Sequence, residues 1–161
     1  MCIRDSPKYA PFFYYLGKEL NPKRAFFYGI DIGLIPYSFM MSCKSIQELF
    51  LYNCSDGDYS PRFLKRNLNQ VYENNYKFVE EFDKSFEIKF NIIFHQAIED
   101  QEQNRYVLET LWKNLESGGH MVIEGLEKNK EYKEGAITFA KNVNKELIYF
   151  STRYGTAILV K

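Results

Sequence analysis

The sequence lacks an excess of charge of either sign. Its 161 residues include 21 basic and 21 acidic side chains, so the formal net charge is zero. Nucleic acids and anionic membranes recruit proteins through a positive field, and we therefore predict neither as a partner. The chain also lacks any apolar run near the roughly 18 residues that a membrane helix needs.

Cysteine is scarce, and its spacing carries no metal motif. The three cysteines are Cys2, Cys43 and Cys54. None forms a CxxC pair, which argues against a zinc site built from thiolates. An odd number of loosely spaced cysteines favours a reducing compartment. We therefore predict a cytoplasmic protein.

The first six residues, MCIRDS, lack the apolar region of a signal peptide. They resemble a translated sequencing-adapter scar. We therefore assign a single domain to residues 7–161 and leave residues 1–6 outside it. If these residues are such a scar, the natural N-terminus is missing from this sequence and the natural protein could be longer.

The rest of the chain alternates between apolar strands and amphipathic helices. Hydrophobic residues make up 45% of it, which is typical of a folded protein. Turn residues end the fourth helix at 117–119, and the charged segment 125–135 reads as a loop. We predict helices over 9–20, 36–43, 60–72, 100–115 and 136–144, and strands over 25–31, 48–53, 76–80, 90–95, 120–124, 146–151 and 156–161. This alternation, closed by a hairpin, predicts a parallel sheet covered on both faces.

The order of these pieces resembles the class I S-adenosylmethionine-dependent methyltransferases. The resembling stretches are FFYGIDIG, ELFLYN followed by SPRFLKRNL, FNIIFHQAIED, and ETLWKNLESGGHMVIE. The Gly118-Gly119 pair and the closing hairpin are the most specific of them. The resemblance implies an α/β, Rossmann-like three-layer sandwich. Its mostly parallel sheet has seven strands, or slightly fewer, and an antiparallel C-terminal hairpin.

The resemblance also implies a cofactor site at the end of the first strand. Asp31 and Gly33 match the family's acid and first loop glycine, and the acid would face the amino group of S-adenosylmethionine. The later loop glycines are replaced, for example by Leu34 and Tyr37. Glycine lets the backbone approach a ligand and adopt a positive φ without penalty. We therefore expect these side chains to narrow the pocket.

Further positions of the implied cofactor site are altered. Asn53 stands where the family has an acid for the ribose hydroxyls, and one weakened bond of this kind costs about 1–3 kcal/mol. Around the end of the third strand, Glu80, Glu81 and Asp83 keep acids that could reach the adenine amino group, and we take Glu81 as the candidate. Asn91 and Gln96 replace the acids of the fourth strand. Several such replacements predict a partly eroded site, or a site rebuilt for another ligand.

Side chains at the carboxyl ends of the fourth and fifth strands lie near the mouth of the implied pocket, and we count His95 and Gln96 among the cofactor-binding candidates. His95 and Gln96 end the fourth strand, and a histidine with a pKa of about 6.5 can act as a general base. The alternative is a histidine that packs or faces water. Glu124 ends the fifth strand at the same edge, so His95 or Glu124 can orient or deprotonate the acceptor. Some family members bind a divalent metal here, but Gln96 is a poor ligand for it, and we predict none.

Two functions from different classes fit these observations. The first is an S-adenosylmethionine-dependent methyltransferase with an unknown acceptor and a partly eroded cofactor site. The alternative is a non-catalytic protein that keeps this fold as an interaction or scaffold module, because a fold does not fix a function. A third interpretation, another nucleotide enzyme on a similar sheet, is disfavoured by the closing hairpin. The sequence predicts no oligomeric state.

Overall fold

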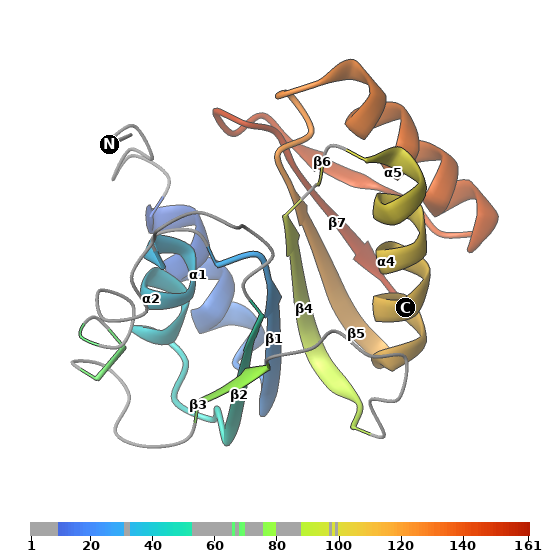
Figure 1. The fold of residues 1–161 in the computed structure, drawn as a ribbon. Coiled ribbons are helices and arrows are strands. Elements are labelled where there is room, and N and C mark those ends of the chain that lie inside the picture. Colours follow the sequence, from blue (N-terminus) through green and yellow to red (C-terminus); the bar gives the residue numbers. More distant parts are fainter. Residues whose placement is uncertain are drawn as a thin grey trace. The chain divides into compact units, whose positions relative to one another are not determined.

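A computed structural model describes residues 10–30, 33–52, 66, 68–69, 76–79, 88–96, 98 and 100–161. The chain divides into two compact units, residues 1–81 and 82–161 (Figure 1). Asp31, Asn53, Glu81, residues 1–6 and most of the helix expected over 60–72 lie outside the described residues. The assignment of one domain to residues 7–161 stays a prediction.

The first unit contains a parallel three-stranded sheet and two helices. Its elements are α1 (Ala10–Leu20), β1 (Arg24–Tyr28), α2 (Leu34–Met40), β2 (Glu48–Tyr52) and β3 (Tyr76–Val79). The strands lie in the order β3-β2-β1. Residues 25–28 and 49–51 are buried, as expected for strands of a parallel sheet covered on both faces. Helices α1 and α2 meet at Gly17, where a Cβ atom would lie 2.6 Å from the carbonyl oxygen of Phe39.

The second unit contains a mixed sheet and two helices that pack against each other. Its elements are β4 (Phe90–Gln96), α4 (Gln101–Asn114), β5 (Leu115–Glu124), α5 (Lys130–Asn142), β6 (Ile148–Phe150) and β7 (Thr156–Val160). The strands lie in the order β4-β5-β7-β6. β4 and β5 are parallel, whereas β7 runs antiparallel to both of its neighbours. The predicted closing hairpin is confirmed, and the described residues hold the seven strands that were expected.

The first strand is shorter than the sequence predicted. It was expected to run over 25–31, but β1 ends at Tyr28. Gly29 has a φ of 86°, in the left-handed region that glycine adopts without strain. The backbone therefore turns at Gly29, although its N–H still donates to the carbonyl oxygen of Tyr52 at 2.9 Å.

The sequence predicted that residues 117–119 end a helix, but in the structure they lie within a strand. Helix α4 ends at Asn114, and β5 begins at the next residue. The ladder between β4 and β5 shifts its register opposite this segment. Gly118, with a φ of 77°, donates its N–H to the carbonyl oxygen of Lys161. The two glycines therefore form an irregular start to the strand, paired with the last residue of the sequence.

The charged segment 125–135 is only partly a loop, and the helix expected over 136–144 begins earlier. Helix α5 starts at Lys130, because the side chain of Asn129 caps it by accepting a hydrogen bond from the N–H of Glu131. Lys130 and Glu134 then form an ion pair at i,i+4. Charged residues had suggested a loop, but here they cover the outer face of a helix.

Candidate site at the strand ends

Gly33 forms a tight turn after β1. It is buried, and it precedes α2 with a φ of 80° and a ψ of 13°. Its N–H donates to the carbonyl oxygen of Ile30 at 2.7 Å, and its own carbonyl oxygen accepts from the N–H of Tyr37 at 3.0 Å. Glycine adopts this conformation without a Cβ penalty. The turn therefore has the shape that the resemblance implies, while cofactor binding by Gly33 remains a prediction.

The residues that replace the later loop glycines belong to α2. The helix begins at Leu34, and Pro36 lies in its first turn, as predicted. None of the described residues from Leu34 to Tyr37 has a positive φ. The missing glycines therefore cost this backbone no strain. Leu34 and Tyr37 are both partly exposed.

Two stacked tyrosines end the neighbouring strands β1 and β2. Tyr28 and Tyr52 are partners in the ladder, and their ring centroids lie 5.0 Å apart with 28° between the ring planes. Tyr52 directly precedes Asn53 in the sequence. The pair was not predicted, because the sequence was expected to continue both strands past the tyrosines, over 25–31 and 48–53. The ends of both strands are thus fixed by a side-chain stack.

His95 lies in the interior of the second unit. Its side chain is 0% exposed, and its Nε2 lies 2.7 Å from Oδ1 of Asn104 on α4. Burial lowers the pKa of His95 to about 4, although the hydrogen bond to Asn104 opposes this shift. The same Oδ1 atom accepts from the N–H of Ile98, in the connection between β4 and α4. This geometry favours the packing role of His95 over that of a general base.

Gln96 and Glu124 lie next to each other at the carboxyl ends of β4 and β5. They are partners in the ladder, one position beyond His95 and Ile123. Because side chains alternate along a strand, Gln96 and Glu124 point to the face opposite His95. Both are partly exposed. The expected neighbourhood of these two residues is confirmed, whereas His95 lies on the other face of the sheet.

Glu124 is held by hydroxyl groups that the sequence analysis did not identify. Its Oε1 atom accepts a hydrogen bond from Oγ1 of Thr156 at 2.8 Å, and that hydroxyl lies 2.8 Å from Oγ1 of Thr152. Burial raises the pKa of Glu124 to about 7, whereas Thr156 and the charge of Lys128 lower it. The carboxyl group can therefore both hold and release a proton near neutral pH, a property typical of functional sites.

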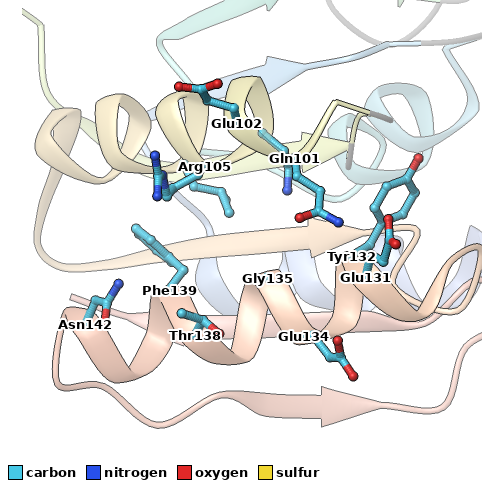
Figure 2. A pocket seen from close by; sticks show the side chains of 12 residues that line it. Gln101, Glu102, Arg105, Glu131, Tyr132, Glu134, Gly135, Thr138, Phe139 and Asn142 are labelled. Atoms are coloured by element: carbon cyan, nitrogen blue, oxygen red, sulfur yellow. The ribbon is translucent and has the colours of Figure 1, made fainter.

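A pocket of 470 Å³ lies between α4 and α5 (Figure 2). Its walls include the apolar side chains of Leu108 and Phe139 and the buried Asn104 that binds His95. Asn104 and His95 belong to the face of the sheet that α4 covers, and alternation places Glu124 on the other. No sequence pattern predicts this pocket, because it depends on the spacing of two helices.

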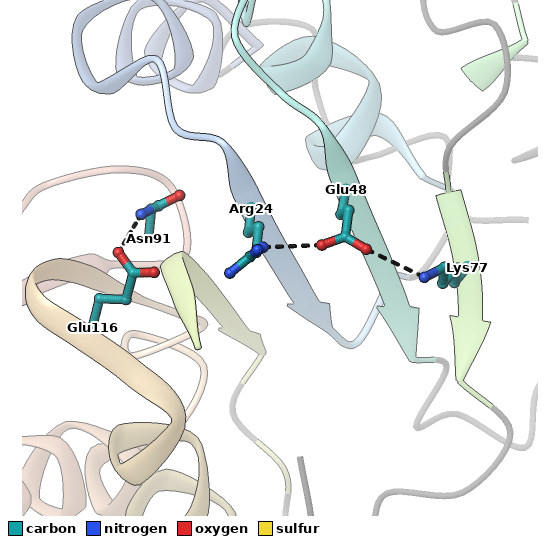
Figure 3. Close-up of polar contacts among 5 residues, drawn as sticks. All are labelled: Arg24, Glu48, Lys77, Asn91 and Glu116. Atoms are coloured by element: carbon teal, nitrogen blue, oxygen red, sulfur yellow. Dashed lines mark hydrogen bonds and ion pairs between the residues drawn. The ribbon is translucent and has the colours of Figure 1, made fainter. Parts of the chain in front are cut away.

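The amino ends of the strands carry polar contacts of a structural kind (Figure 3). In the first unit, Glu48 binds Arg24 at 2.9 Å and Lys77 at 3.3 Å, and so connects all three strands. In the second unit, Nδ2 of Asn91 donates to Oε2 of Glu116 at 2.6 Å. Asn91 therefore joins the start of β4 to β5, at the end of the strand away from Gln96.

No group of three or more histidine, cysteine, aspartate or glutamate side chains among the described residues is arranged to hold a metal ion. No helix among them combines the length and the apolar character needed to cross a membrane.

Comparison with solved structures finds methyltransferases. A Podospora anserina methyltransferase bound to S-adenosylhomocysteine (SAH) matches 96% of this chain and 78% of its own, with 11% identity and a TM-score of 0.74. The match to a Bacillus cereus O-methyltransferase in complex with SAH covers 97% of this chain and 82% of that protein, with 13% identity and a TM-score of 0.69. The match to a Geobacter sulfurreducens methyltransferase covers 94% of this chain and 77% of that protein, with 11% identity and a TM-score of 0.74.

No protein-family model matches the sequence, and no curated protein matches it either. At 11–13% identity, the similarity to these structures shows the fold. The predicted fold class is confirmed. The protein has the Rossmann-like α/β fold of the class I S-adenosylmethionine-dependent methyltransferases, with a mostly parallel seven-stranded sheet and an antiparallel C-terminal pair of strands.

Proposed function

We propose that the protein binds S-adenosylmethionine at the carboxyl ends of its strands and transfers the methyl group to an acceptor. The observation that carries this proposal is the similarity, over 96–97% of the chain, to two methyltransferases that hold SAH. In open α/β sheets, ligands bind outside the carboxyl ends of the strands. The buried left-handed turn at Gly33 supports the proposal, because it fits the first glycine of a cofactor loop.

The proposal gives the predicted cofactor residues different roles. It assigns Asp31 to the amino group, Asn53 to the ribose and Glu81 to the adenine, three residues that lie outside the described part of the chain. Gly33 provides the turn. Gln96 lies at the edge where the ligand enters. His95 acts indirectly, because its partner Asn104 also binds the N–H of Ile98 and so shapes the connection that follows Gln96.

Methyl transfer requires little covalent chemistry from the protein itself. Bound S-adenosylmethionine supplies the electrophilic methyl group. The chain must hold the acceptor in line with that group and exclude water, and positioning of this kind accounts for a large part of a rate enhancement. If Asn53 accepts fewer hydroxyl hydrogen bonds than an acid would, we expect weaker cofactor binding by about 1–3 kcal/mol.

Calorimetric titration with S-adenosylmethionine and with SAH tests the proposal. We expect both ligands to bind, and we expect Gly33→Trp to abolish binding, because its side chain would be attached to a buried, left-handed turn. Gly135→Trp is the matched control, since a Cβ atom built there meets no heavy atom within 4 Å beyond its chain neighbours and its own helix backbone. Absence of binding to the unaltered protein, at any ligand concentration up to the millimolar range, would contradict the proposal and leave the scaffold role.

A further inference from the structure

The two side chains that the sequence offers for proton transfer differ in their access to an acceptor. His95 is completely buried and faces Asn104 on α4. Glu124 is the last residue of β5 and is partly exposed at the carboxyl end of the strand. A general base must come within hydrogen-bonding reach of the proton that it removes. Of the two, only Glu124 meets this condition in the structure.

We propose that Glu124 accepts the proton of a hydroxyl acceptor, and that the hydroxyl groups of Thr156 and Thr152 position its carboxylate. This inference rests on the proposed methyltransferase function and deepens it. It identifies the residue that removes the proton, a role that the fold by itself does not assign.

The hydrogen bonds around Glu124 have a defined direction. Thr156 donates its single hydroxyl hydrogen to Oε1 of Glu124, so its oxygen can only accept from Thr152. Thr156 is 0% exposed, so this donor is fixed inside the protein. Among the described residues, Thr156 is the one hydrogen-bond partner of the carboxyl group. The second oxygen, Oε2, is thereby left for the acceptor.

The surroundings of Glu124 suit a proton acceptor at neutral pH. Its neighbours in the sheet, Gln96 on β4 and Thr156 on β7, are uncharged. Lys128, four residues further along the chain, is the charged group that acts on it, and it favours the carboxylate. Burial opposes ionisation, so the pKa of Glu124 lies at about 7. A catalytic base works best when its pKa is close to the operating pH.

The step balances without a further reactant. The proton of the acceptor hydroxyl moves to Oε2 of Glu124, and the O–H electron pair remains on the acceptor oxygen. That oxygen forms the new bond to the methyl carbon as the carbon–sulfur bond breaks with its electron pair left on sulfur. The products are a methyl ether, a neutral thioether and a protonated Glu124, which returns the proton to water.

The test follows the transfer of tritiated methyl from S-adenosylmethionine to phenol, catechol and benzyl alcohol between pH 5.5 and 8.5. Aniline and thiophenol serve as nitrogen and sulfur counterparts. We expect transfer to oxygen, with kcat/KM rising through an apparent pKa near 7. Glu124→Gln should lower kcat about 100-fold or more, as expected for loss of a general base. The same substitution should change the Kd of S-adenosylmethionine less than about twofold, because the base acts on the acceptor.

Glu127→Gln is the matched control. Glu127 lies three residues from Glu124, is exposed, and binds Lys133 and Tyr149 rather than the threonines. We expect its kcat to match that of the unaltered protein. A positioning role predicts that Thr156→Val, which removes a hydrogen bond that favours the carboxylate, raises the apparent pKa of the pH–rate profile. Thr156→Ser should restore it.

Cofactor binding separates the two proposals. Failure of the unaltered protein to bind S-adenosylmethionine would overturn the proposed function, and the inference with it. If the cofactor binds, the inference is overturned by full activity of Glu124→Gln, by faster transfer to aniline or thiophenol, or by the absence of transfer to every hydroxyl probe. If Thr156→Val does not raise the apparent pKa of the pH–rate profile, the positioning role of the threonines is overturned.

Discussion

Burial shifts two ionisable side chains of the second unit in opposite directions. It lowers the pKa of His95 to about 4 and raises the pKa of Glu124 to about 7. In both residues burial disfavours the charged form, which is positive for histidine and negative for glutamate. Both side chains are therefore neutral together between these two values, and each links the stability of the fold to pH.

Glu124→Gln should stabilise the protein in a pH-dependent way. The folded pKa of Glu124, about 7, lies above its ordinary value of 4.5. Folding therefore becomes less favourable as the pH rises from about 4.5 through 7. Glutamine cannot ionise, and its carbonyl oxygen still accepts from Thr156. We expect the variant to be about 2 kcal/mol more stable at pH 8 and equally stable at pH 4.5, measured by urea denaturation. A difference independent of pH would contradict this explanation.

A substitution that lowers activity and raises stability marks a functional site. If Glu124 served packing alone, Glu124→Gln would leave methyl transfer unchanged while it stabilised the fold. The stability measurement and the kinetic measurement therefore test different properties of the same carboxyl group. Their combination distinguishes a catalytic residue whose burial destabilises the fold from a structural one.

At the scale of elements, the sequence predicted strands and helices where apolar patterns are continuous. The apolar runs at 49–51 and 92–94 form buried strand cores, and α1 ends before Asn21-Pro22 as expected. The wrongly predicted element boundaries lie at glycines and in a charged segment. Gly29 and the pair at 118–119 have conformations that depend on pairing with distant residues. In α5 the density of charges outweighed the helix signals present, the Asn129 cap and the i,i+4 spacing of Lys130 and Glu134.

Replacing a glycine by alanine should change the free energy of unfolding in opposite directions at two positions inside helices. A Cβ atom on Gly17 of α1 would lie 2.5 Å from Oγ of Ser42 and 2.6 Å from the carbonyl oxygen of Phe39. Because that oxygen belongs to the backbone of α2, Gly17→Ala must push the two helices apart, at a cost of about 1–3 kcal/mol. Gly135→Ala in α5 meets no atom within 4 Å and should stabilise by about 0.5–1 kcal/mol.

The free energy of unfolding of the two alanine variants, from urea denaturation, checks this pair. The same substitution in both helices cancels the difference in helix propensity between glycine and alanine. The remaining difference therefore measures the close approach of α1 to α2. Equal changes in stability for Gly17→Ala and Gly135→Ala would contradict the packing seen at Gly17.

At the scale of the whole molecule, the sequence predicted the edge of the sheet that carries the site but not its hydrogen bonds. Gln96 and Glu124 were expected together, because parallel strands end at one edge. Thr152 and Thr156 escaped notice, because their place beside Glu124 follows from the antiparallel register of β5 and β7. The burial of His95 likewise depends on a residue of α4. A sequence pattern within one segment does not predict the contacts that this segment makes with distant ones.

The chain has one tryptophan, and its place gives the second unit its own optical signal. Trp112 lies on α4, where its ring meets Phe139 edge to face at 5.8 Å. His95 and Glu124 belong to the same unit. The folded pKa of His95 lies below its ordinary value of 6.5, so its contribution to stability is complete above pH 6.5 and is lost as the pH falls toward 4. The contribution of Glu124 changes in the opposite direction, between pH 4.5 and 7.

These opposing changes predict a maximum of stability at mildly acidic pH for the unit that Trp112 reports. In urea denaturation followed by tryptophan fluorescence, we expect the free energy of unfolding to be highest between about pH 5 and 6.5. Glu124→Gln should remove the decline on the alkaline side. His95→Gln should weaken the decline on the acidic side, in part only, because burial also lowers the pKa of His120. A fluorescence-detected stability that rises steadily from pH 5 to 8 would contradict the raised pKa of Glu124, because a buried Glu124 opposes that rise.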